Sequence, residues 1–325
     1  MTNSSVDIPE VAIITRTKNR PLFLERALKS VLGQSFGSFV HVILNDGGNK
    51  ADVEQALAKY PDSRRLVIHN KQSAGLSKAL NQAIRASKSE YVCILDDDDA
   101  WHKDRLSIGL ETMRSRDASA SVVPMEIVIE DVDDKGSIVE IERVPHPESW
   151  CGEVSLFKQA HRNYLSNGAI MYKRSVYDEL NGYDEGLLTS EDWDFGIRLM
   201  LRYDVEQVIS DIALMYYHQR PTVKESDAGN SVHAGVREQA RAITVIRNRF
   251  LRNDIQNGVF GIGYIMNHSE QELVNLVRIE GHVNRASAML EDKIVARVRG
   301  DTRRIAKNQS LYRRLRRKIS RGNTK

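Results

Sequence analysis

The sequence predicts an α/β protein built on a mostly parallel sheet, and two observations lead to that prediction. Over roughly the first hundred residues, short aliphatic runs alternate with amphipathic helical stretches. Repeated β-α-β units of this kind imply a parallel sheet with helices on both faces. Polar clusters also follow three of the strand-like runs, at residues 15–19, Asp46 and residues 96–99. Because such sheets bind ligands beyond the carboxyl ends of their strands, the clusters predict one shared binding edge.

The first four strands and three helices follow from local signals. Pro21 suits the first turn of a helix that Gly33 ends, and Pro61 ends a second helix that begins at Ala51. A third helix is expected over 75–87, where apolar residues recur on one side. The strands are expected where aliphatic residues gather between turn signals, at 11–15, 41–44, 66–68 and 91–95.

The second half of the chain changes from mixed to helical near residue 235. A helix is expected from Asp104 to Met113, and a hairpin joins the β-rich run 121–129 to 138–144. Further along, extended segments are expected at 169–172, 208–212 and 213–217, and helices at 191–202, 237–251, 271–278 and 284–298. We therefore expect an α/β domain over 1–235 and a helical extension over 236–325.

Composition narrows the class of protein. The chain has 325 residues, a formal net charge of +3 and a 41% hydrophobic share, which supports a packed core of about two domains. Two cysteines are too few for a disulfide framework or a cysteine zinc site. The first ten residues carry no basic or apolar segment typical of a secretory signal. A cytoplasmic protein is expected.

Four consecutive carboxylates after the fourth strand form the most informative cluster. Like charges at this spacing raise each other's pKa unless a cation neutralises them. Oxygen ligands favour Mg²⁺ or Mn²⁺, which can also bind phosphate. A solvated acidic turn that caps the helix near Asp104 is the alternative. A metal site fits better at the end of a strand in this β-α series, where the cluster would bind the cation before an anionic ligand.

Several of these motifs resemble the family 2 glycosyltransferases with the GT-A fold. The resemblance covers about residues 10–220 and includes Asn45-Asp46-Gly47, Leu95-Asp-Asp-Asp-Asp99 and Glu191-Asp192-Trp-Asp194. Residues 15–21 and 75–81 also match, although Leu80 stands where many relatives carry Arg. The stretch 167–172, before 182–185, is similar to the acceptor-side segment of the family.

The resemblance implies roles for individual residues. Asp46 would accept a hydrogen bond from the base, commonly uracil, and Asp96 would lie at the ribose. Asp98 would bind a Mn²⁺ or Mg²⁺ ion that bridges the donor diphosphate, with His218 as a second ligand or as a structural residue. Arg220 would pair with phosphate or remain a surface arginine. The implied nucleotide-sugar-binding residues are Thr15, Arg16, Thr17, Asn19, Asp46, Gly75, Lys78, Asp96 and Asp97.

The acceptor side would be formed by Asn167, Gly168, Glu191 and Trp193. An acceptor hydroxyl needs a carboxylate base on the opposite face of the sugar, and a single base implies inversion. Asp192 is the expected base, and Asp194 is the alternative. Trp193 would stack on an acceptor sugar or pack in the core.

The C-terminal 25 residues are strongly basic. Residues 301–325 carry 10 basic and 1 acidic residue, a net +9, which leaves −6 for residues 1–300. Basic side chains over 303–321 surround Leu311, Leu315 and Ile319, which recur every four residues. This pattern suits an anionic membrane surface. Nucleic acid, or a solvated terminus, is the alternative, and an oligomer through 276–290 is possible.

The predicted function is inverting, metal-dependent sugar transfer from a nucleoside diphosphate donor, expected to be a UDP-sugar. The acceptor would be a hydroxyl of a cell-envelope glycan or a lipid-linked precursor, and the enzyme would lie at the inner face of the plasma membrane. A non-catalytic membrane- or nucleic-acid-binding module is the alternative. Nucleotidyl transfer fits less well, because residues 15–19 contain no glycine for a phosphate loop.

Overall fold

A seven-stranded sheet forms the centre of the molecule, with strand order β10-β6-β9-β4-β1-β2-β3. The computed structural model describes residues 8–133, 137–145, 154–221 and 236–268. Neighbouring strands are parallel from β4 through β1 and β2 to β3. This confirms the predicted parallel sheet. Its strands are β1 (Val11–Thr17), β2 (Phe39–Asp46), β3 (Arg65–Asn70) and β4 (Tyr91–Ile94).

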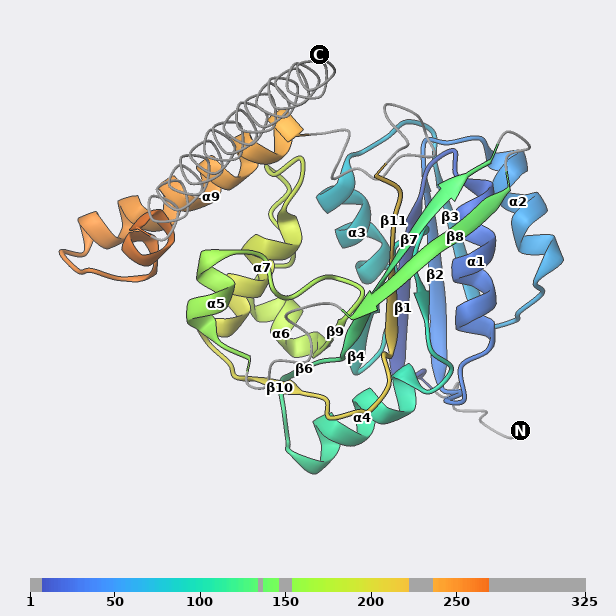
Figure 1. Ribbon diagram of the computed structural model, residues 1–325, viewed down its shortest axis with the longest axis horizontal. Coiled ribbons are helices and arrows are strands. Elements are labelled where there is room, and N and C mark those ends of the chain that lie inside the picture. The colour runs from blue at the N-terminus through green and yellow to red at the C-terminus, as the bar shows by residue number, and fades with distance from the viewer. Residues whose placement is uncertain (1–7, 134–136, 146–153, 222–235, 269–325) are drawn as a thin grey trace, which may run out of the picture. The chain divides into compact units, whose positions relative to one another are not determined.

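The other end of this sheet is mixed. Strand β9 (Ile170–Lys173) lies antiparallel between β4 and β6 (Ala120–Val122), and β10 (Val205–Gln207) runs parallel to β6. The segment before β9 therefore reaches the same edge as the polar clusters that follow β1 and β4 (Figure 1).

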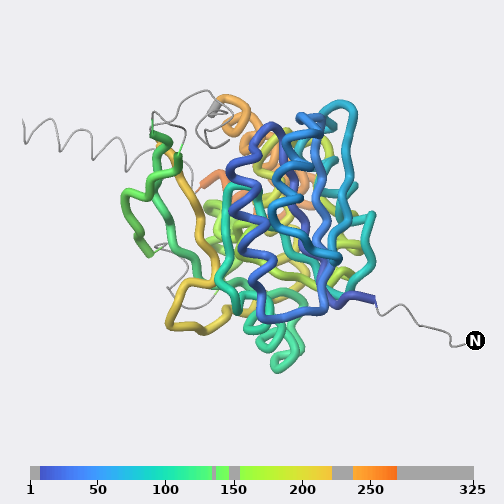
Figure 2. The backbone as a smooth tube through the Cα atoms, turned by 90° about the vertical axis from the view of Figure 1, so that its right-hand side faces the viewer, coloured from blue at the N-terminus to red at the C-terminus, as the bar shows by residue number. Residues whose placement is uncertain are grey.

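Helices cover both faces of the parallel strands. Ile43 packs with Leu24 of α1 (Pro21–Leu32) and Val53 of α2 (Lys50–Lys59). Its neighbour Leu44 faces the other way, into the main core with Leu80 of α3 (Leu76–Arg85). Figure 2 shows α1 and α2 side by side over one face. The alternation of side chains along a strand produces this arrangement. Helix α4 (Arg105–Ser115) follows the fourth strand as expected.

A small second sheet brings distant parts of the chain to the acidic cluster. Its strand order is β5-β11-β7-β8. The predicted hairpin is present as β7–β8, but the run 121–129 is not a single strand: its first residues belong to β6 of the large sheet and its last residues to β7. The antiparallel pair of β5 and β11 places Met215 opposite Trp101 and Tyr216 opposite Ala100. His218 and Arg220 are thereby close to residues 96–99. The strands are β5 (Ala100–Trp101), β7 (Met125–Val132), β8 (Ile138–Pro145) and β11 (Met215–Gln219).

Several shorter helices, one of them over residues 262–268, and one long helix follow in the described part of the chain. Helix α7 (Glu191–Met200) begins where the sequence predicted, and α9 (Val236–Gln256) extends the predicted helix at its end. Trp193 and Ile197 of α7 share a hydrophobic cluster with Ala242 and Ile246 of α9 and with Met266. The short helices α5 (Leu156–His161) and α6 (Arg174–Glu179) were not predicted.

The compact unit that contains the sheets runs to Met266, whereas the sequence placed a boundary near residue 235. Helix α9 is part of this unit because its apolar side packs on α7. The extended segment expected at 208–212 is wrong: β10 lies earlier, and Ser210 forms a local turn by donating to the Ile212 carbonyl at 2.9 Å. The helices expected at 271–278 and 284–298, the 276–290 spacing and the basic segment 303–321 lie outside the described residues. Within the described part of the chain, no helix is long and apolar enough to cross a membrane.

Candidate active site

The first and third polar clusters of the sequence meet at the carboxyl edge of the sheet. The Thr17 hydroxyl, at the end of β1, donates to Asp97 Oδ2 at 2.7 Å. Arg20, just before α1, donates from Nη1 to Asp97 Oδ1 at 3.1 Å and to Asp98 Oδ2 at 3.3 Å. The loop after β1 and the loop after β4 are therefore joined through carboxylates, as expected for neighbouring parallel strands.

Asp46 brings the second cluster to the same edge. Its fully buried carboxylate accepts from Arg16 Nη2 at 3.2 Å, from the Ser73 hydroxyl at 2.9 Å and from the N–H of Gly75 at 3.3 Å. Burial alone would raise the pKa of Asp46, but the N–H of Ala74, the side chains of Asn70 and Ser73 and the charge of Arg16 hold it below its ordinary value. The ionised Asp46 thus fixes the 73–75 turn against the end of β2.

The remaining residues predicted around the nucleotide lie below or beside this edge. Thr15 is fully buried, and its hydroxyl lies 2.9 Å from Nε2 of His41 inside the sheet. Asn19 adopts a φ of 56°, and its Oδ1 accepts from the Asn49 N–H at 2.9 Å. Lys78 is exposed on α3. Arg16, Thr17, Asp46, Gly75 and Asp97 are therefore gathered together, while the Thr15 and Asn19 side chains support the backbone around them.

The four carboxylates after β4 are crowded and largely buried. Burial raises the pKa of Asp96 well above its ordinary value, and the nearby charges of Asp99, Asp98, Asp97 and Asp192 add to that shift. Burial also raises the pKa of Asp97, to about 6, with the Asp98 charge as a further cause. A group of carboxylates in this state gains from a neighbouring cation.

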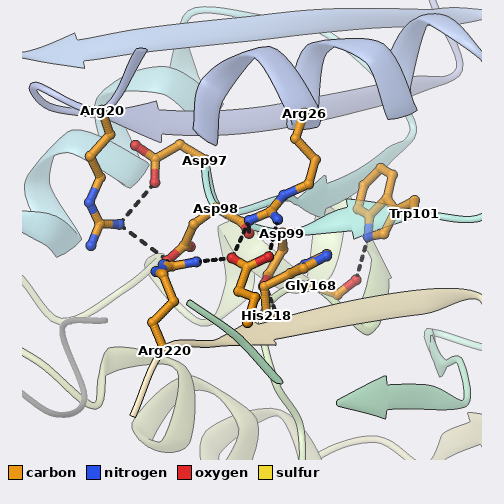
Figure 3. A network of polar contacts seen from close by, with 10 residues as sticks. Arg20, Arg26, Asp97, Asp98, Asp99, Trp101, Gly168, His218 and Arg220 are labelled. Carbon is orange, nitrogen blue, oxygen red and sulfur yellow. Dashed lines mark hydrogen bonds and ion pairs between the residues drawn. The ribbon is translucent and has the colours of Figure 1, made fainter. Parts of the chain in front are cut away.

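Three arginines supply part of the compensating positive charge, and two of them also pair with Glu130 (Figure 3). Arg26 on α1 donates to both oxygens of Glu130, at 2.7 and 3.1 Å, and also to the backbone carbonyl of Asp98. Arg220 donates to Glu130 Oε1 at 2.5 Å and to Asp98 Oδ2. Arg20 contacts Asp97 and Asp98. Of these four residues, only Arg220 was considered from the sequence. Arg20 lies inside the matched segment 15–21, and Glu130 carries no sequence signal.

His218 lies beside the same cluster in its neutral form. Its backbone N–H donates to Asp99 Oδ1 at 2.9 Å, and its ring Nδ1 is 3.8 Å from that oxygen. Burial, followed by the charge of Arg26, lowers the pKa of His218 to about 4. The imidazole is therefore neutral near pH 7, the form that binds metal ions.

Asp98 and His218 fit a cation that is shared with phosphate. A carboxylate oxygen and a neutral imidazole are both ligands of Mn²⁺. Among the residues that the structure describes, no three His, Cys, Asp or Glu side chains are grouped to hold a metal ion. Mg²⁺-type sites with one or two protein ligands complete their coordination with phosphate oxygens and water. The residues present therefore suit a cation that arrives with a diphosphate.

A second acidic pair faces the cluster from the start of α7. The Asp96 charge contributes to a raised pKa of Glu191, after burial and Asp192, and the Asp192 charge acts on Asp96. Asn167 Nδ2 donates to Glu191 Oε1 at 3.2 Å. Asn163 Nδ2 donates to Asp192 Oδ2 at 2.7 Å. Burial raises the pKa of Asp192 despite that hydrogen bond. The half-buried Asp192 is thus a carboxylate with raised basicity.

Backbone contacts fix the segment that was predicted to form the acceptor side. Trp101 Nε1 donates to the Gly168 carbonyl at 2.9 Å, and the fully buried Arg105 donates to the Ile170 carbonyl at 2.9 Å. A Cβ at Gly168 would lie 2.2 Å from Met215 Cε, so a larger residue there would require the end of the Met215 side chain to move. These contacts fix Asn167, whose Oδ1 also accepts from the Tyr183 hydroxyl at 3.0 Å.

Trp193 and Asp194 point away from this side. Trp193 is only 3% exposed and donates from Nε1 to the Gln159 carbonyl at 2.6 Å, so its ring packs in the core and cannot stack on a sugar. Asp194 is fully buried and accepts from Arg198 Nε at 2.8 Å and from Arg249 of α9. The alternative base is therefore engaged in holding α9 on α7, and its carboxylate is not available to an acceptor.

Replacing Asp194 by asparagine is expected to lower the free energy of unfolding by about 3 kcal/mol, because removing one partner of a buried ion pair leaves the other uncompensated. The exposed Asp204, beyond the end of α7, provides the same substitution without a buried partner. Urea unfolding should show a change below about 0.5 kcal/mol for Asp204→Asn. Equal stability of Asp194→Asn and the parent protein would contradict the structural role.

The pH dependence of stability should show that ionisation of Asp97 is less favourable in the folded protein than in the unfolded chain. Since its folded pKa lies near 6, above the ordinary value of 3.8, the folded protein loses stability relative to the unfolded chain as pH rises through that range. Asp97→Asn does not ionise, so its stability relative to the parent should improve between about pH 4.5 and pH 7. Urea unfolding at both pH values measures this difference. A difference that is constant with pH would show that Asp97 ionises freely.

The fold and the site together define a class of protein. A parallel sheet with a carboxylate-rich edge, a small second sheet and an acidic helix start opposite belongs to the GT-A glycosyltransferases. The solved structure of S. aureus TarS 1–349 in complex with UDP-GlcNAc has the same fold, with a TM-score of 0.59 and 20% identity over 74% of this chain and 66% of that chain. The mannosyltransferase PcManGT of Pyrobaculum calidifontis, in complex with GDP-Man and Mn²⁺, has a TM-score of 0.54 at 14% identity, over 84% and 76% of the two chains.

Sequence comparison places the chain in a family. The profile of Glycosyl transferase family 2 matches residues 12–180, more than half of the sequence, and the chain belongs to this family. It is 27% identical to the uncharacterized glycosyltransferase MJ1057 of Methanocaldococcus jannaschii, over 65% of this chain and 71% of the relative. It is 24% identical to the O-antigen biosynthesis glycosyltransferase WbnJ of Escherichia coli, over 66% and 83%. The predicted family and fold are confirmed.

Proposed function

We propose that this glycosyltransferase is an inverting, divalent-cation-dependent enzyme that uses a UDP-sugar. Its acceptor would be a hydroxyl of a cell-envelope glycan or a lipid-linked precursor. Relatives in the same family include a protein named for O-antigen biosynthesis, and one protein of the same fold was solved with UDP-GlcNAc. Family membership favours an enzyme over the alternative of a non-catalytic binding module.

The opposition of two acidic groups is the observation that supports this function most strongly. Asp96–Asp99 lie at the carboxyl edge of the sheet. After burial and its Asp neighbours, the charge of Asp192 contributes to the raised pKa of Asp96, and the charge of Asp96 contributes to the raised pKa of Glu191. A donor diphosphate beside the first group places the anomeric carbon between the two. A base on the far side of that carbon leads to in-line displacement with inversion.

Asp192 would take the proton of the acceptor hydroxyl as the new bond forms. Its raised pKa suits that role, because a general base works best when its pKa approaches the working pH. Asn163 orients the carboxylate through its hydrogen bond to Oδ2. Glu191, fixed by Asn167, precedes the base at the start of α7. A divalent cation held by Asp98 and His218 would neutralise the charge that develops on the leaving diphosphate.

The nucleotide would lie along the edge formed by Arg16, Thr17, Asp46, Gly75 and Asp97. The ordered 73–75 turn provides a wall, since three of its groups donate to Asp46. We further propose that the basic segment 303–321 brings the enzyme to an anionic membrane, where a lipid-linked acceptor would be found.

A thermal-shift panel tests the donor class. Nucleoside diphosphates and nucleotide-sugars are added to the full chain with and without Mn²⁺, since a ligand that binds only the folded state raises the melting temperature. UDP and UDP-sugars should give the largest shifts, and only with the cation. Absence of any shift from every nucleotide would contradict the proposal. Equal shifts of the melting temperature without Mn²⁺ would contradict the proposed dependence on a divalent cation.

A further inference from the structure

Glu130 is a buried carboxylate that contacts two arginines but no proposed ligand. It lies on β7 of the small sheet and is 1% exposed. One oxygen accepts from Arg220 at 2.5 Å, and both accept from Arg26. Because an isolated buried carboxylate is costly, this arrangement requires both arginines to stay close to it. Glu130 therefore determines where the two guanidinium groups lie.

Arg220 is held in one orientation that reaches Asp98. Its side chain is fully buried, and its guanidinium lies 4.1 Å from the centre of the Phe23 ring. With Nη1 on Glu130, its Nη2 donates to Asp98 Oδ2. The planar fork of an arginine suits such a bridge between two carboxylates. Arg220 thus neutralises the same Asp98 oxygen that also accepts from Arg20.

A cation and these arginines would need the same carboxylate. The guanidinium of Arg220 binds a phosphate as well as it binds a carboxylate. Arrival of a diphosphate therefore offers Arg220 a second anion next to the first, and the oxygen of Asp98 becomes available. Glu130 keeps Arg220 within reach of both partners during this exchange.

We propose that Arg220, positioned by Glu130, exchanges Asp98 for the donor diphosphate, so that cation and diphosphate bind together and the cation alone binds weakly. This inference rests on the proposed function and extends it to the order of binding. It differs from the order expected from the sequence, in which the acidic cluster binds the cation first. The sequence did not show that arginines already neutralise these carboxylates, and the expected order therefore took no account of them.

Manganese binding by the full chain tests the exchange without any turnover. Free Mn²⁺ is followed by electron paramagnetic resonance, first with protein alone and then with UDP or with inorganic pyrophosphate. We expect the parent protein to bind Mn²⁺ weakly alone and at least about tenfold more tightly with either anion. Arg220→Gln should bind Mn²⁺ alone about tenfold more tightly than the parent, as expected from loss of one competing charged hydrogen bond. Its gain in Mn²⁺ affinity on adding either anion should largely disappear.

Arg26→Gln is the matched control for charge. It removes the same charge from the same cluster and also leaves Glu130 with one arginine, but the hydrogen bond from Arg26 to Asp98 goes to the backbone carbonyl and not to the carboxylate. We expect it to change the affinity for Mn²⁺ alone by less than about threefold, which is below the effect of one hydrogen bond to a charged group. Equal tightening in Arg26→Gln and Arg220→Gln would show a general charge effect and overturn the exchange. Unchanged Mn²⁺ affinity in Arg220→Gln would overturn it as well.

A second variant and a binding measurement on the parent protein distinguish failure of the exchange from misfolding and from failure of the proposed function. If Arg220→Gln does not fold, Arg220→Lys retains the charge but cannot bridge Glu130 and Asp98, and it should still bind Mn²⁺ alone more tightly than the parent. Failure of that increase would contradict the exchange. If the parent protein binds neither UDP nor pyrophosphate at any Mn²⁺ concentration, the proposed function itself fails. If the parent protein binds UDP and pyrophosphate, and the variant has the same affinities for Mn²⁺ as the parent, only the exchange is rejected.

Discussion

Asp192→Asn is expected to lower the rate of sugar transfer by about 10²- to 10⁴-fold, the range that a positioned general base contributes. The amide keeps the size of the side chain and the contact with Asn163 but cannot accept a proton. Asp192 is half-buried, and its charge acts on Asp96 among the carboxylates after β4. The loss should therefore appear in kcat, and binding of UDP with Mn²⁺ should remain close to that of the parent.

The control for this variant is Asn163→Ala, which removes the orienting hydrogen bond but keeps the base. Its loss of rate should be much smaller. Because the Asn163 amide stabilises the charged form of the carboxylate, its removal raises the pKa of Asp192, and the acid limb of the pH profile should shift to higher pH. Undiminished turnover in Asp192→Asn would show that another group removes the proton.

Asp98→Asn is expected to lower transfer by about 10²- to 10³-fold, because charge stabilisation by a metal ion accounts for several kcal/mol. In contrast to Asp192→Asn, this variant should also lose the Mn²⁺-dependent part of UDP binding. The fold should survive, since Arg20 keeps its contact with Asp97 and Arg220 keeps Glu130.

Chelation provides the independent check on Asp98. EDTA should reduce the parent protein to a similar rate, and added Mn²⁺ should restore it. Added Mn²⁺ should not restore Asp98→Asn. Full activity of the parent in EDTA would remove the cation from the mechanism and leave the arginines around Asp98 as the charge that balances the diphosphate.

Much of the fold could be predicted because its signals are local. Aliphatic runs and helix boundaries such as Pro21 define β1 to β4 and α1 to α3 within a residue or two on most sides. The short helices α5 and α6 and the two-residue β5 carry too few residues for a period to show. They form because the surrounding core accepts them, which is a tertiary effect.

The residues of the candidate site also fall into those that the sequence predicted and those that it did not. Asp46, Asp97 and Asp192 could be located because motifs follow strands or begin a helix. The arginine network could not, since Arg26 and Glu130 are 104 residues apart, and Arg220 and Asp98 are 122 apart. The burial of the Trp193 side chain could not be predicted either, because its neighbours in α9 lie about fifty residues further along the chain. Partners of ionised groups across a sheet leave no periodic signal in one sequence.

The stereochemistry of transfer tests the central claim most directly. A UDP-α-sugar that stabilises the protein is turned over with water as the acceptor, and the released sugar is followed by proton nuclear magnetic resonance before its anomers equilibrate. With Asp192 acting alone on the face opposite the diphosphate, we expect the β-anomer to appear first. First appearance of the α-anomer would require a second displacement or attack from the leaving-group side, and would contradict Asp192 as the base of an inverting enzyme.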